Sequence, residues 1–111
     1  MGERLLKVDQ LLLEEVVSRI RETADPERII LFGSAATGEM GRDSDLDLLV
    51  LLNSPENPRQ ESVRIRSGLR GLGWPIDVLV MDRERFDQTK DLVGGLAYPA
   101  HRYGRVLYAV S

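Results

Sequence analysis

The strongest strand pattern in the chain is Asp45-Leu-Asp-Leu-Leu-Val-Leu-Leu52, with Ser44 just before it. Side chains alternate between the two faces of a β-strand. The unbroken apolar run after Asp47 therefore predicts a central strand that is covered on both faces or at its far end. By the same alternation, Asp45 and Asp47 leave the strand on one face. The stretch thus predicts a buried strand that begins with two neighbouring carboxylates.

Weaker patterns on either side complete an α+β fold. Short apolar runs predict strands at residues 28–32 and 76–81. Apolar residues at three- and four-residue spacing predict helices over residues 9–24 and 59–72. Asp82 suits the cap of a further short helix. We therefore expect a small mixed sheet of about three strands packed with helices.

Composition leaves carboxylates as the main groups available for chemistry. The 111 residues fit one domain spanning residues 1–111. The chain has no cysteine and one histidine, which excludes disulfides, thiolate sites and a histidine-rich metal site within it. Its net charge of −3 argues against direct nucleic-acid binding. Without an apolar run of ~20 residues or a secretory signal core, we expect a cytoplasmic protein with no membrane contact.

Three aspartates are the candidate metal ligands. Asp45 and Asp47 repel each other unless a cation lies between them, and magnesium prefers carboxylate oxygens. A solvated strand start is the alternative interpretation of that pair. Asp77 interrupts an otherwise apolar strand, where an unpaired buried charge would be costly, so either a shared metal or an exposed strand position is expected. The three acids can meet only if their two strands are neighbours.

The segment Leu31-Phe-Gly-Ser34 offers a second kind of site. A strand that ends in Gly33-Ser34 before a helical turn presents free backbone N–H groups and a hydroxyl, which suit a phosphate. An ordinary serine cap after a glycine turn explains the same residues.

Taken together, these segments resemble a known family. The order is Leu31-Phe-Gly-Ser34, ten residues, Asp45-Leu-Asp-Leu48, and a later Asp77 in a strand. This pattern resembles the DNA polymerase β-like nucleotidyltransferase superfamily, and the size resembles its minimal nucleotidyltransferase branch. The tail from Tyr98 to Tyr108 is similar to that of members paired with HEPN-domain proteins in toxin–antitoxin modules.

The resemblance implies an activity and roles for the three acids. Asp45, Asp47 and Asp77 would be the catalytic residues and would hold two Mg²⁺ ions. A nucleoside monophosphate, AMP from ATP, would pass to a hydroxyl of a partner protein. The expected partner is a HEPN-domain protein, with this chain as the antitoxin.

The resemblance also implies a nucleotide-binding set, which consists of Gly33, Ser34, Arg42 and Ser44. Many members carry arginine in the loop after the Gly-Ser pair, whereas this chain has Ala35 and Thr37 there. Arg42 is a candidate replacement for that basic contact. The change keeps an alternative open, namely a catalytically inactive binding module that neutralises a partner by contact alone. Antibiotic nucleotidyltransferases share the motif but need extra helical bulk that this chain lacks.

Two surface features have plain interpretations. Arg59, Arg66 and Arg70 share one helical face by spacing, which is typical of a solvated charged surface. The apolar residues Leu5 and Leu6 and the apolar end 106–108 suit packing against another chain, either a homodimer partner or a different protein.

Overall fold

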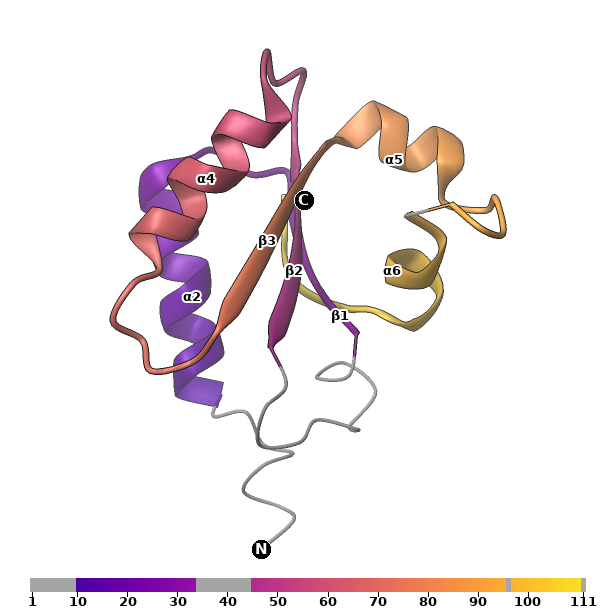
Figure 1. Ribbon diagram of the computed structural model, residues 1–111. Helices are drawn as coiled ribbons and strands as arrows, with labels where there is room; N and C mark the ends of the chain where they lie inside the picture. The colour runs from indigo at the N-terminus through magenta and orange to yellow at the C-terminus, as the bar shows by residue number, and fades with distance from the viewer. Residues whose placement is uncertain (1–9, 34–44, 96, 111) are drawn as a thin grey trace, which may run out of the picture.

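The computed structural model describes residues 10–33, 45–95 and 97–110. The described elements follow one another along the chain as shown in Figure 1. They are α2 (Gln10–Thr23), β1 (Arg28–Phe32), β2 (Leu46–Leu52), α4 (Pro58–Gly68), β3 (Ile76–Asp82), α5 (Arg83–Thr89), α6 (Ala97–Tyr103) and β4 (Arg105–Ala109).

The strands form one mixed sheet in the order β3-β2-β1-β4. Strands β2 and β3 are parallel, whereas β1 runs antiparallel to both β2 and β4. The α+β class and the mixed sheet are therefore as predicted from the sequence. Strand β2 is an inner strand, and its last five residues, Leu48 to Leu52, are all buried. The apolar run in the sequence thus marked the centre of the sheet.

The fourth strand corrects the expected count of about three. Strand β4 pairs with β1 along the edge of the sheet, with a register shift between Ile29 and Ile30. None of its five residues is fully buried, because its outer edge is open to solvent. The apolar residues 106–108, which the sequence suggested for contact with another chain, thus belong to the sheet of their own domain.

Helices cover both faces of the sheet (Figure 1). Helices α2 and α4 lie on one face over a large cluster that includes Val16, Ile20 and Ile65. Helices α5 and α6 lie on the other face over a smaller cluster around Phe86 and Ala100. The smaller cluster leaves more of this second face for polar groups.

The helix boundaries follow from capping chemistry. Helix α4 begins with Pro58 after Asn57, whose side chain accepts a hydrogen bond from the Gln60 amide at 3.1 Å. Asp82 caps α5 as predicted, and its carboxylate also accepts from the Ser54 amide at 3.1 Å. No helix in the described ranges is long and apolar enough to span a membrane.

Candidate active site

Asp47 and Asp77 lie directly opposite each other on neighbouring strands. The parallel register of β2 and β3 pairs these two residues, so both carboxylates leave the same face of the sheet. Asp47 alternates along β2 with Leu49 and Leu51, which pack under α5 and α6, so the acids lie on that face. Asp45 comes just before β2 and is exposed. The condition that the two acidic strands be neighbours is therefore met.

The electrostatics of Asp47 reflect its two acidic neighbours. Partial burial raises the pKa of the Asp47 carboxyl above its ordinary value of 3.8, and the charges of Asp77 and Asp45 raise it further. Like charges this close favour either a proton or a cation between them. A divalent cation would relieve this repulsion without a change in pH.

Gly33 places the end of β1 against the same carboxylate. Phe32, the last residue of β1, pairs with Asp47 in the sheet, and Gly33 follows with a φ of 75°. A Cβ atom on Gly33 would lie 2.5 Å from Oδ2 of Asp47, closer than real Cβ atoms come to other atoms. Glycine is therefore required here twice, for its backbone angle and for the space beside the acid.

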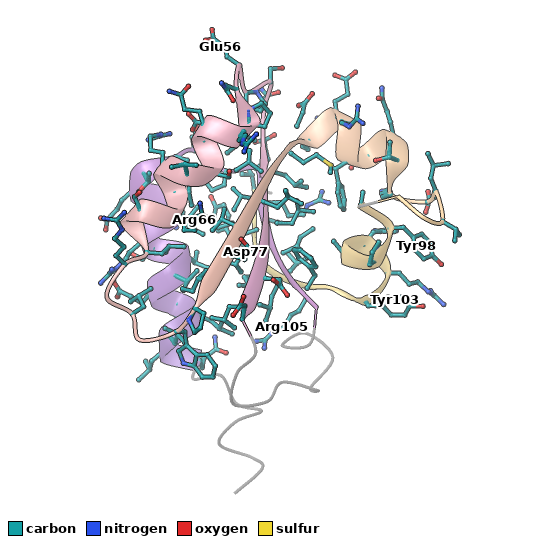
Figure 2. The ribbon with its side chains drawn as sticks, viewed as in Figure 1. Glu56, Arg66, Asp77, Tyr98, Tyr103 and Arg105 are labelled. Atoms are coloured by element: carbon teal, nitrogen blue, oxygen red, sulfur yellow. The ribbon has the colours of Figure 1, made fainter. Side chains whose placement is uncertain are left out.

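Asp77 is exposed, which is one of the two interpretations that the sequence left open. Its side chain is 63% exposed, although Val78 and Val80 of the same edge strand are buried. It forms an ion pair with Arg66 of α4, with 3.7 Å between Nη1 and Oδ1 (Figure 2). The sequence placed Arg66 on a solvated surface and missed this contact, since spacing along a helix does not show which strand edge the helix covers.

The site has the carboxylate oxygens that magnesium prefers, but its three aspartates do not yet form a complete set of metal ligands. Carboxylates on paired strand positions are suitable ligands for Mg²⁺. Within the described ranges, however, no three acidic or histidine side chains are close enough together to hold a metal ion as they stand. Asp77 instead lies against Arg66. Metal binding by all three aspartates would require their carboxylates to come closer together than they are here. Of the predicted nucleotide-binding set, Ser34, Arg42 and Ser44 lie outside the described residues.

Comparison with known proteins assigns the family. Residues 12–96, which include Gly33 and all three aspartates, match the family model of the nucleotidyltransferase domain. The chain belongs to this family. This match agrees with the nucleotidyltransferase resemblance that the sequence motifs predicted. No curated protein sequence gives a significant match.

Solved structures agree with this assignment. A candidate nucleotidyltransferase from Sulfolobus solfataricus is 27% identical with a TM-score of 0.57, over 81% of this chain and 78% of that one. A toxin–antitoxin complex with AMP-PNP is 19% identical with a TM-score of 0.54, over 89% and 74% of the two chains. A mutant of the toxin–antitoxin MntA-HpeT is 17% identical with a TM-score of 0.55, over the same shares. The last two likenesses establish the fold alone.

Proposed function

We propose that this nucleotidyltransferase domain moves AMP from ATP to a hydroxyl of a partner protein in a magnesium-dependent reaction. The observation that carries the proposal is the register of Asp47 opposite Asp77, with Gly33 against Asp47. The end of β1 therefore lies next to paired carboxylates. The family supports nucleotidyl transfer in general. The nucleotide, the metal and the acceptor are the proposed parts.

The three aspartates have defined tasks in this proposal. Asp45, Asp47 and Asp77 would hold the metal and with it the triphosphate, and Asp77 would also orient the acceptor hydroxyl. Bound magnesium supplies charge neutralisation and lowers the pKa of that hydroxyl. The hydroxyl oxygen bonds to the α-phosphorus, the bond to the bridging oxygen breaks, and pyrophosphate leaves. The hydroxyl proton passes to the Asp77 carboxylate, whose exposed position leaves it open to an incoming acceptor.

Gly33 and the residues beyond it serve the leaving group. Because Gly33 has no side chain, the end of β1 can lie directly against the Asp47 carboxylate. Ser34 would contribute a hydroxyl to the β- and γ-phosphates, and Ser44 and Arg42 complete the proposed nucleotide-binding set. Catalysis then consists of positioning and charge neutralisation, as in other phosphoryl transfers.

A protein acceptor suits the small size of the domain. Two structural neighbours are toxin–antitoxin proteins, one solved with AMP-PNP and one carrying glutamate at two aspartate positions two residues apart. That spacing is the one between Asp45 and Asp47. We infer that this chain is the antitoxin of such a pair and modifies a HEPN-domain toxin. A homodimer remains the alternative assembly.

Titration calorimetry of ATP into the protein, with magnesium and then with chelator, tests this proposal. Asp45→Asn should abolish magnesium-dependent binding, because it removes one of the metal ligands. Asp25→Asn is the matched control, because Asp25 is an exposed aspartate outside the site. It precedes Arg28, which pairs with Leu51 at the end of β2 opposite to Asp47. If no nucleoside triphosphate binds, the inactive binding module becomes the better account.

A further inference from the structure

Arg66 occupies a fixed place beside the site. It follows Ile65, which is 1% exposed and packs in the core between α4 and the sheet. Leu69, one turn later, is also buried in this cluster. These two contacts hold α4 against the sheet, so the base of the Arg66 side chain is fixed at the outer edge of β3. Figure 2 shows Arg66 on α4 and Asp77 on the strand β3, against which α4 packs.

The guanidinium of Arg66 is a cation already in contact with the acidic site. Of the ion pairs found within the described ranges, the Arg66–Asp77 pair is the one that contains a site aspartate. An arginine stays protonated at every pH at which the protein is folded. Any divalent ion bound jointly by Asp47 and Asp77 must therefore compete with this guanidinium for Asp77.

We propose that Arg66 is a positioning residue that holds the Asp77 carboxylate in an ion pair until a divalent cation replaces the guanidinium. The inference rests on the proposed function, because it assumes that a metal binds these aspartates. The 3.7 Å pair gives Asp77 a cationic partner at a site where the three acids do not form a closed ligand set in the described part of the chain. Arg66 thereby weakens metal binding, because the cation must displace the guanidinium from Asp77.

The pair is weak enough to be exchanged. The Arg66 and Asp77 side chains are 53% and 63% exposed, so water and salt screen their attraction. Exposed ion pairs of this kind shift an equilibrium by up to about fivefold. A divalent cation shared by two carboxylates interacts more strongly than that and can displace the guanidinium.

Titration of Mn²⁺ into the nucleotide-free protein, followed by calorimetry, tests the inference without turnover. Arg66→Gln should tighten Mn²⁺ binding by about two- to fivefold, which is the effect of removing an exposed ion pair. Arg66→Lys, which keeps the charge, should stay close to the wild type. Arg59→Gln removes an exposed arginine from the first turn of the same helix and should change the affinity less.

A double-variant cycle separates the ion pair from a general charge effect. In an Asp77→Asn background, Arg66→Gln should no longer change the Mn²⁺ affinity, because its partner is gone. An equal gain in that background, or no gain from Arg66→Gln in the wild type, overturns the inference. If wild type and Asp47→Asn bind Mn²⁺ alike, the carboxylates hold no metal and the proposed function fails with it. Thermal melting of each variant confirms that the fold is retained.

Discussion

Replacing Gly33 by alanine is expected to disable the site while the fold survives. The added Cβ would lie 2.5 Å from Oδ2 of Asp47, whereas ordinary contact begins at 3.4 Å. The Asp47 carboxylate would therefore have to move by about 0.9 Å. Misplacing a reacting or ligating group by about 1 Å can slow a reaction about 100-fold. We expect a loss of that order in nucleotidyl transfer and a clear weakening of metal-dependent ATP binding.

The same substitution also affects stability, and a matched control separates the two effects. An alanine with a φ of 75° costs about 1–2 kcal/mol, which lowers Tm by about 4–16 °C in a domain of this size. Gly71 has a φ of 86° and nothing within 4 Å of its Cβ position. Gly71→Ala therefore suffers the backbone strain without the contact to Asp47.

The assay compares both variants with the wild type by thermal melting and by ATP calorimetry with magnesium. Both should melt earlier by similar amounts, and Gly33→Ala alone should lose ATP binding. The reasoning is refuted if Gly33→Ala binds ATP as tightly as Gly71→Ala does.

Three further variants test the site and the core. Above pH 3.8 the ionised Asp47 is less favourable in the folded chain than in the unfolded one, because its folded pKa is raised. Without divalent ions, Asp47→Asn should therefore raise Tm at pH 7, and the gain should shrink as pH falls toward 3.8; an equal Tm at pH 7 would contradict this cause. Gly104→Ala would force a Cβ into the Ala100 carbonyl oxygen and the Ile30 side chain. Urea unfolding should therefore show a free energy of unfolding lower by about 1–3 kcal/mol. An unchanged midpoint would be inconsistent with this packing. Replacing Phe86, a fully buried residue of α5, by alanine should lower the free energy of unfolding by about 3–5 kcal/mol in the same assay; a loss below about 1 kcal/mol would show that this core is not closed.

The sequence was sufficient where periodicity and capping act locally. The apolar run after Asp47 identified the inner strand, because only a covered strand keeps both faces apolar. Asp82 identified the start of α5, because its side chain caps the helix within two residues. The family pattern also rests on short spacings, from Gly33 to Asp45 and Asp47.

The features that were wrong or missed depend on contacts between distant segments. Strand β4 joins residues 105–109 to β1 at the start of the chain, and its exposed side chains give no clear alternation. The sequence left the exposure of Asp77 open, because the apolar run around it does not reveal which strand positions the helices cover. Arg66 reaches Asp77 only because α4 packs against β3. Topology, rather than propensity, decided each of these points.

The central claim is tested most directly by following the α-phosphate of ATP. The chain and the protein that co-purifies with it are incubated with magnesium and ATP labelled at the α-phosphorus. We predict that the label becomes covalently attached to the partner protein, and that chelator or Asp47→Asn prevents this. ATP labelled at the γ-phosphorus should leave the partner unlabelled. Absence of transfer by the wild type, or equal transfer by Asp47→Asn, would contradict the assignment of nucleotidyl transfer to these carboxylates.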